Sequence, residues 1–282
     1  MPEQSVLIAG CGDLGSRLGI GLLQTGLKVY GLRRNINQLS PGIQGIQADL
    51  NDPDTLNSLP VCTILVYAVS ASARDETSYR AAYCTGLMNL LSALEQPPEH
   101  LFFVSSTAVY HQNDGGWVDE KSPTKPESFA GRIMLEAEHI ALNSGIPTTV
   151  LRLSGIYGPG RQYLINQVRQ GISAPKIPVQ FSNRIHRDDG ADAIQHLISR
   201  SLAGYPLSRI YLISDDQPAP LSEVCDWLAA QLKVSLSHKQ LRRGAGSKRC
   251  SNRALRATGY NFRYPGYQDG YSPLLNELTK AD

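Results

Sequence analysis

A glycine pattern near the start of this 282-residue chain limits its fold more than any other feature. Four consecutive apolar residues at 6–9 run into Gly-x-Gly-x-x-Gly, with glycines at 10, 12 and 15. Leucine then recurs at helical spacing, at Leu14, Leu18 and Leu22. Four apolar residues are too few for a helix of their own, so the pattern predicts a strand, a tight turn and a helix.

Each glycine of this turn has a physical reason. Gly10 permits the sharp turn, Gly12 lacks a Cβ and so lets a diphosphate approach the backbone, and Gly15 lets the helix pack close to the strand. The helix N-terminus adds N–H groups and a partial positive charge. A buried glycine turn without a ligand is the alternative, but the flanking strand and helix favour a dinucleotide site. We expect the diphosphate to bind at Gly10, Gly12, Asp13, Leu14 and Gly15.

The end of the next expected strand, 28–32, indicates which dinucleotide binds. An acidic residue here would accept a hydrogen bond from the ribose 2′-OH of NAD, but this strand ends in Arg33-Arg34. Guanidinium groups pair with phosphate through parallel, charge-assisted hydrogen bonds, which suits the 2′-phosphate of NADP. The alternative is a pair of solvated arginines at a strand end. We expect NADP, in preference to NAD, as the cofactor.

Along the rest of the chain, expected strands alternate with expected helices. Further strands are predicted at 45–50, 62–69, 100–106, 148–153 and 209–214, and helices at 79–94, 131–143 and 189–201. This alternation predicts an α/β fold, a doubly wound parallel sheet of the Rossmann type with ligands at the carboxyl ends of its strands. We expect 1–154, with a return segment 186–214, to form the dinucleotide-binding domain. A smaller C-terminal substrate lobe would comprise 155–185 and 215–282.

The composition argues against several other classes of protein. Apolar residues make up 41% and charged residues 18%, as in an ordinary globular protein, and no apolar run is long enough to span a membrane. The N-terminus enters a core strand directly, which leaves no room for a signal peptide. The five cysteines are odd in number and form no Cys-x-x-Cys. We therefore expect reduced thiols, no metal site and a cytoplasmic location.

The net charge is only +2, but one interval is strongly basic. Between Trp227 and Gln268 there is no Asp or Glu, against nine Lys or Arg residues. Such an interval can be merely a solvated face, or it can bind anions. No aromatic residue follows Trp227 in this interval before Tyr260, so a nucleic-acid partner is not expected.

These motifs, in this order, resemble the extended or atypical short-chain dehydrogenase/reductases, in particular the NAD(P)-dependent epimerase/dehydratase group. The resemblance covers most of the chain and includes the glycine turn and the segments 105–110, 151–161 and 185–189. It implies a cofactor site that also contains Asp49, Leu50, Ala68, Val69, Ser70, Gly155 and Ile156. The first two would meet the adenine ring, and the last two would lie near the nicotinamide. Ser106 corresponds to the catalytic serine or threonine of the family.

The resemblance fails at the acid–base pair of the family, Tyr-x-x-x-Lys. In that pair the lysine lowers the tyrosine pKa and holds the nicotinamide ribose, and the tyrosine moves the proton. The flanking sequence places Ala130 at the tyrosine and Met134 at the lysine. A shift by one residue gives Phe129 and Ile133, and none of the thirteen tyrosines has a lysine four residues later. The standard pair is therefore absent.

Other residues would have to move the proton. Ser106, Tyr110 and His186 are the candidate catalytic residues, with His111 as a further one, because all are expected near the cofactor end of the sheet. The two histidines and Tyr110 each also have a purely structural interpretation. Tyr110 could simply lie beside the substrate, His111 could be solvated, and His186 could fix the start of a helix.

The basic interval offers a place for the substrate. Residues 247–253 mix cations with small hydrogen-bonding side chains, which suits phosphate or carboxylate recognition. We expect an anionic small molecule to be held by Arg161, Lys248, Arg249 and Arg253. One hypothesis is an NADP-binding epimerase/dehydratase- or reductase-like protein with a non-standard proton relay, acting on a ligand such as a nucleotide sugar. The other is a catalytically silent NAD(P)-binding sensor or scaffold; either would be a monomer or a homodimer without a membrane partner.

Overall fold

The computed structural model describes residues 4–239 and 247–281. The chain divides into two compact units. Unit 1 comprises Met1–Val109, Thr124–Arg152 and Ala191–Tyr211, and unit 2 comprises Tyr110–Pro123, Leu153–Gly190 and Leu212–Asp282. Unit 2 contains both segments expected to form the substrate lobe, 155–185 and 215–282. It also contains 110–123, 153–154, 186–190 and 212–214, which were expected in the dinucleotide-binding domain.

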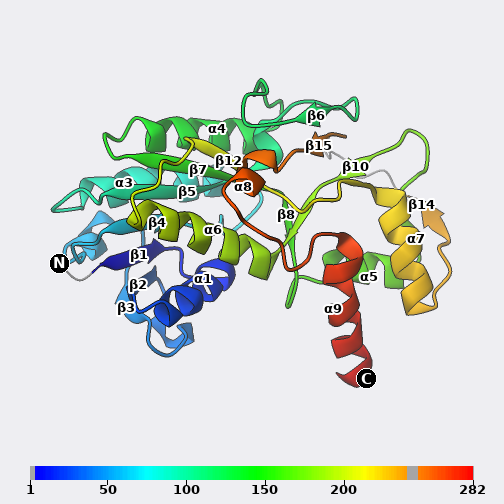
Figure 1. Cartoon of the computed structure of the whole chain (residues 1–282), viewed down its shortest axis with the longest axis horizontal. Coiled ribbons are helices and arrows are strands. Elements are labelled where there is room, and N and C mark those ends of the chain that lie inside the picture. Colours follow the sequence, from blue (N-terminus) through cyan, green and yellow to red (C-terminus); the bar gives the residue numbers. More distant parts are fainter. Residues whose placement is uncertain (1–3, 240–246, 282) are drawn as a thin grey trace. The chain divides into compact units, whose positions relative to one another are not determined.

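A seven-stranded sheet dominates the secondary structure (Figure 1). Its order is β12–β7–β5–β4–β1–β2–β3, and β3, β2, β1, β4 and β5 pair in parallel. The strands are β1 (Ser5–Ala9), β2 (Lys28–Arg33), β3 (Gln44–Gln47), β4 (Ile64–Tyr67), β5 (His100–Ser106), β7 (Thr148–Leu153) and β12 (Ile210–Ile213). The chain winds outward from β1 in both directions, so the predicted doubly wound α/β fold is confirmed.

The centre of this sheet explains the apolar runs of the sequence. All residues of β1 and β4 are buried, as expected for parallel strands that are covered on both faces. The covering helices include α1 (Asp13–Gln24), α3 (Gly86–Ser92), α4 (Phe129–Leu142) and α6 (Arg187–Leu202). Short turns lie at η1 (Ile36–Gln38), η2 (Pro53–Leu56) and η4 (Thr107–Val109).

The helix expected at 79–94 starts earlier and is not regular. It consists of α2 (Glu76–Tyr79), a π-helical turn η3 (Arg80–Thr85) and α3. The irregularity has a tertiary partner, because the buried phenol of Tyr67 at the end of β4 donates a hydrogen bond to the carbonyl oxygen of Ala82, at 2.5 Å. No local sequence pattern predicts that contact.

Unit 2 is built from short strands and four helices in its described part. The strands are β6 (Trp117–Val118), β8 (Gly155–Tyr157), β9 (Ile172–Ser173), β10 (Phe181–Ser182), β11 (Arg184–His186), β13 (Ala219–Pro220), β14 (His238–Lys239) and β15 (Arg249–Cys250). The helices are α5 (Tyr163–Arg169), α7 (Leu221–Leu232), α8 (Arg253–Ala257) and α9 (Tyr267–Ala281). Helices α5, α7 and α9 share one apolar core, in which Ile165, Leu228 and Leu274 are buried.

A buried ion pair joins α4 to the sheet of unit 1. Glu138 on α4 is 1% exposed, and its carboxylate accepts two hydrogen bonds from the guanidinium of Arg152 on β7, at 2.9 and 2.7 Å. The hydroxyl of Ser105 on β5 donates to the same carboxylate at 2.5 Å. Helix α4 and strands β5 and β7 are therefore joined through one carboxylate that is shielded from water.

We expect Glu138→Gln to destabilise the protein by about 3 to 5 kcal/mol, because it leaves the Arg152 charge buried without its counter-charge. Urea unfolding followed by circular dichroism measures this change. The matched control is Glu136→Gln on the same helix, whose carboxylate is 48% exposed and pairs with Arg80 at 2.9 Å. It should cost less than about 1 kcal/mol, as exposed pairs do. Equal losses in the two variants would contradict the prediction.

Candidate functional site

The turn between β1 and α1 has a backbone that only glycine adopts readily. Gly10 has a φ of +84°, and a Cβ there would lie 2.7 Å from the carbonyl group of Ala68. A Cβ on Gly15 would lie 2.7 Å from the carbonyl oxygen of Gly10, so α1 packs directly on the turn. At Gly12, the nearest described atom is the Gly10 carbonyl oxygen, 4.0 Å from the Cβ position. The N-terminus of α1 is therefore open beside Gly12, where a phosphate can approach.

The two arginines at the end of β2 are held differently. The guanidinium of Arg33 donates to the carbonyl oxygen of Cys11 in the glycine turn (3.2 Å) and to Oε1 of Gln38 (2.6 Å). Arg34 is exposed. One guanidinium is thus positioned against the turn, and the next arginine offers its charge to solvent or to a ligand.

The other expected cofactor residues of unit 1 follow the neighbouring strands. Asp49 and the buried Leu50 come after β3, and the Asp49 carboxylate accepts the backbone N–H of Asn51 at 3.0 Å. Residues 68–70 come directly after β4, and the Ala68 N–H donates to the carbonyl oxygen of Ala9 at 2.8 Å. Since the carboxyl ends of parallel strands share one edge of a sheet, these residues lie along the same edge as the glycine turn.

Helix α4 carries no acid–base pair. Its N-cap is Ser128, whose hydroxyl accepts the N–H of Gly131 at 3.2 Å. Ala130 is half-buried and Met134 is 4% exposed, so an alanine and a buried apolar side chain occupy the two expected catalytic positions. A Cβ on Gly131 would lie 2.5 Å from the carbonyl oxygen of Ala108, which shows how closely α4 packs on η4.

The three candidate catalytic residues all have structural partners. The hydroxyl of Ser106, at the end of β5, accepts the N–H of Ala108 at 3.1 Å. The buried phenol of Tyr110 donates to the carbonyl oxygen of Asp119 at 2.8 Å. The imidazole of His186 is 2% exposed, and its Nδ1 accepts the N–H of Asp188 at 3.2 Å. His186 therefore binds the first turn of α6.

Unit 2 contains His111, the further candidate catalytic residue, and also Gly155 and Ile156, which are expected near the nicotinamide. His111 is exposed, one residue after Tyr110. Gly155 and Ile156 form part of β8, which pairs in parallel with β11 and places Ile156 beside Ile185. Gly155 is exposed and Ile156 is half-buried.

Sequence reasoning missed a buried polar cluster in unit 2. Arg184 and Asp215 are 5% and 1% exposed, and the Asp215 N–H donates to the Arg184 carbonyl oxygen at 2.8 Å. Nη1 of Arg184, Oδ2 of Asp215 and the phenol oxygen of Tyr157 have no hydrogen-bond partner among the described residues. These three atoms can bind a small polar group such as a water molecule. No motif marks them, because residues 157, 184 and 215 lie far apart in the chain.

Burial sets the protonation of this cluster. It raises the pKa of Asp215 to about 7, although the nearby positive charge of Arg184 acts in the opposite direction. It also raises the pKa of Tyr157, and the Asp215 charge adds to that shift. Asp215 therefore changes charge near neutral pH.

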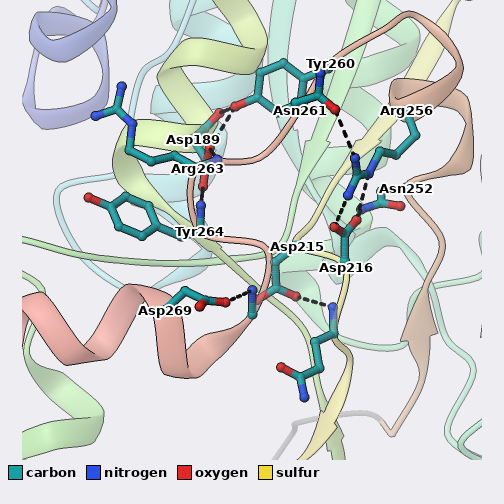
Figure 2. A network of polar contacts seen from close by, with 12 residues as sticks. Asp189, Asp215, Asp216, Asn252, Arg256, Tyr260, Asn261, Arg263, Tyr264 and Asp269 are labelled. Atoms are coloured by element: carbon teal, nitrogen blue, oxygen red, sulfur yellow. Dashed lines mark hydrogen bonds and ion pairs between the residues drawn. The ribbon is translucent and has the colours of Figure 1, made fainter.

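A second network fixes the chain after α8. Figure 2 shows the carboxylate of Asp189, at the start of α6, facing the segment 260–264. Asp189 is 0% exposed and accepts the phenol of Tyr260 (3.0 Å) and the N–H groups of Arg263 and Tyr264 (both 2.8 Å). Nearby in the same view, Asp216 accepts hydrogen bonds from Asn252 and Arg256. These contacts hold part of the basic interval inside the fold.

Several cations of that interval have structural roles. Lys248 is 8% exposed, its Nζ donates to the carbonyl oxygen of Tyr110 at 3.3 Å, and burial lowers its pKa. Nε of Arg249 donates to the carbonyl oxygen of Gly115 at 2.8 Å, and its guanidinium lies 5.1 Å from the ring centre of Trp117. Arg253, at the start of α8, is exposed. Arg161 is half-buried, and Arg242 and Arg243 lie outside the described residues.

Neither a metal cluster nor a spanning helix occurs in the described part of the chain. Among residues 4–239 and 247–281, no three His, Cys, Asp or Glu side chains are grouped so that they could hold a metal ion. In the same residues, no helix combines the length and the apolar character needed to cross a membrane. All five cysteines are buried thiols.

The family of this chain follows from a match to a protein-family model. Residues 6–204 match the model of the NAD dependent epimerase/dehydratase family. The chain belongs to that family. The predicted resemblance to the epimerase/dehydratase group is therefore confirmed. A human relative, short-chain dehydrogenase/reductase family 42E member 1, is 26% identical over 259 residues, which cover 77% of this chain and 64% of that protein.

Two relatives match the epimerase/dehydratase chain almost end to end. Protein YeeZ of Escherichia coli K12 is 29% identical over 278 residues, which cover 93% of this chain and 97% of YeeZ. A solved structure from Methylobacillus flagellatus, assigned to the NAD-dependent epimerases/dehydratases, is 41% identical with a TM-score of 0.83 and covers 98% and 99% of the two chains.

A more distant structure shares the fold. It is the UDP-glucose 4-epimerase of Thermus thermophilus in complex with NAD, which is 22% identical with a TM-score of 0.80 over 99% of this chain and 100% of that one. The bound NAD and the epimerase activity are those of the Thermus protein.

The buried carboxyl of Asp215 generates a prediction on pH dependence. Its pKa in the folded state, about 7, exceeds the value of about 3.9 in an unfolded chain, so the folded state binds the proton more tightly. The free energy of unfolding should therefore fall as pH rises from about 4 to about 7. Asp215→Asn removes this dependence. The free energy of unfolding of this variant, minus that of wild type, should be about 2 to 3 kcal/mol higher at pH 8 than at pH 5.

Urea unfolding at the two pH values measures the change. Asp226→Asn is the control, because its carboxylate lies at the surface of the same unit, 46% exposed. The stability difference between this control and wild type should stay constant with pH. If the Asp215→Asn difference is equally constant, Asp215 is not the titrating group.

Proposed function

We propose that this protein binds NADP along the carboxyl edge of its sheet and acts on an anionic small molecule such as a nucleotide sugar. The observation that carries the proposal is the open backbone at Gly12 beside two arginines at the end of β2. When bound, the nicotinamide would supply hydride transfer. The residues of the chain would bind the cofactor, orient the substrate and move the proton.

The arginines favour NADP over NAD. Arg33 is already oriented by its bond to the carbonyl oxygen of Cys11, so little entropy would be lost on meeting a phosphate. The exposed Arg34 follows on the chain and adds a second positive charge. No carboxylate stands at this position to accept a hydrogen bond from a ribose hydroxyl, which is the feature that selects NAD.

Within the expected anion site, the exposed Arg253 is the most available cation, and we assign it first contact with a phosphate or carboxylate. Lys248 and Arg249 would act mainly by holding the segments of Tyr110 and Gly115, to whose carbonyl oxygens they donate. Arg161 would complete the set. This assignment favours ligands with several acidic oxygens, as nucleotide sugars have.

The proton relay would differ from that of typical family members, because Ala130 and Met134 cannot titrate. Ser106 ends β5 at the expected cofactor edge, and we keep it as a candidate to bind the reacting group. Tyr110 and His186 remain candidates for proton transfer, each held in one orientation by its backbone partner. A group that is oriented in advance loses less entropy in the transition state.

The second candidate function is that of a catalytically silent NAD(P)-binding sensor or scaffold. The specific observation in its favour is the buried Met134 at the position where family members carry the lysine. A screen of nucleotide sugars with NADPH and NADP distinguishes the two. Turnover would support the enzyme, whereas cofactor binding without turnover or ligand stabilisation would support the sensor.

We expect Arg34→Ala to weaken NADP binding about 10- to 100-fold, because it removes a charge-assisted hydrogen bond to the 2′-phosphate. NAD lacks that phosphate, so its affinity should change less than about twofold. Isothermal titration of both cofactors against wild type and variant measures the effect.

Arg209→Ala is the matched control, since this exposed arginine precedes β12 and so lies at the amino end of a strand in the same sheet. It should leave both affinities unchanged. Equal affinities of the wild type for NADP and NAD, or a parallel loss of both in Arg34→Ala, would contradict the assignment of NADP.

A further inference from the structure

The irregular helix after β4 is closely fitted to the sheet. The phenol of Tyr67, which is fully buried, donates to the carbonyl oxygen of Ala82 inside the π-helical turn η3. A Cβ on Gly86 would lie 2.9 Å from that phenol oxygen, so the contact requires glycine there. A π-helical turn inserts one extra residue into a helix and often occurs at functional sites.

Tyr83 lies in this turn and reaches back to the segment after β4. It is half-buried, and its phenol lies close to the backbone N–H of Ala71, which partly opposes the rise in the phenol pKa that burial causes. Ala71 directly follows Ala68–Ser70, the expected cofactor residues.

An aromatic chain links Tyr83 to the start of α4. The ring centres of Tyr83 and Tyr79 are 5.3 Å apart, and those of Tyr79 and Phe129 are 5.4 Å apart in an edge-on arrangement. Phe129 is the first residue of α4 and precedes Ala130. Tyr83 therefore stands between the end of β4 and the helix that lacks the tyrosine and the lysine.

The sheet order says which half of a dinucleotide this region would meet. In a doubly wound sheet the cofactor crosses the point where the strand order reverses, which here lies between β1 and β4. Arg33 and Arg34 assign the adenosine half to the β1–β2–β3 side. The nicotinamide half then extends over β4 and β5, on the side of Tyr83.

We propose that the phenol of Tyr83 hydrogen-bonds the nicotinamide ribose and so replaces the ribose contact that the lysine supplies in other family members. This inference rests on the proposed binding of NADP. A phenol both donates and accepts, which suits the paired hydroxyls of a ribose. Burial raises the pKa of Tyr83, the opposite of what a proton-transferring tyrosine needs near neutral pH. The role of Tyr83 is therefore to position the cofactor.

The test compares two ligands that share the adenosine half. NADP carries the nicotinamide ribose, whereas adenosine 2′,5′-bisphosphate lacks it but keeps the 2′-phosphate. We expect Tyr83→Phe to weaken NADP binding about 3- to 10-fold, the effect of one neutral hydrogen bond, and to leave the bisphosphate affinity within about twofold of wild type. Tyr79→Phe is the matched control from the same aromatic chain and should change neither. Arg34→Ala should weaken both ligands together.

Each outcome has one meaning. Wild-type NADP affinity in Tyr83→Phe, or an equal loss for both ligands, overturns the role of Tyr83 while leaving the proposed cofactor intact. Failure of the wild type to bind either ligand overturns the proposed function itself, and this inference with it. The ring is kept in Tyr83→Phe, so packing is preserved, and unchanged thermal unfolding of the free variant verifies this.

Discussion

Backbone packs directly on backbone at Gly10, and the carboxyl edge of the sheet in unit 1 depends on that contact. A side chain at Gly10 would meet the carbonyl group of Ala68, and one at Gly15 would meet the carbonyl oxygen of Gly10. These two contacts bring β1, the end of β4 and the N-terminus of α1 together. Because backbone atoms cannot move aside as side chains do, a Cβ at either position would push these elements apart.

In helix α4, the contacts that hold the helix on the sheet involve other residues than the two positions of the expected acid–base pair. The buried pair of Glu138 and Arg152, joined by Ser105, keeps the helix on the sheet at three elements. One turn earlier on the same helix, Met134 is buried and apolar. The contacts that place the helix do not need the residues that would react, so a fold can be retained while its reaction changes.

In unit 2, several charged side chains stabilise the fold. Asp189 has no contact with solvent, and its carboxylate satisfies donors from residues 260–264. Lys248 and Arg249 donate to backbone carbonyl oxygens of another segment of the unit. An interval rich in cations is thus not uniformly a solvated face, because burial with hydrogen-bond partners removes part of its charge from the surface.

Local patterns in the sequence determined the β1–turn–α1 unit and the absence of Tyr-x-x-x-Lys, since each depends on residues a few positions apart. The alternation of strands and helices along the chain determined the doubly wound sheet. Tertiary structure alone decided the π-helical turn, where the carbonyl oxygen of Ala82 accepts a hydrogen bond from the phenol of Tyr67, fifteen residues earlier. It also decided the burial of Lys248 and the backbone hydrogen bond between Asp215 and Arg184, which are about thirty residues apart. Spacing along the chain reports helix and strand periodicity, whereas burial depends on which distant segments pack together.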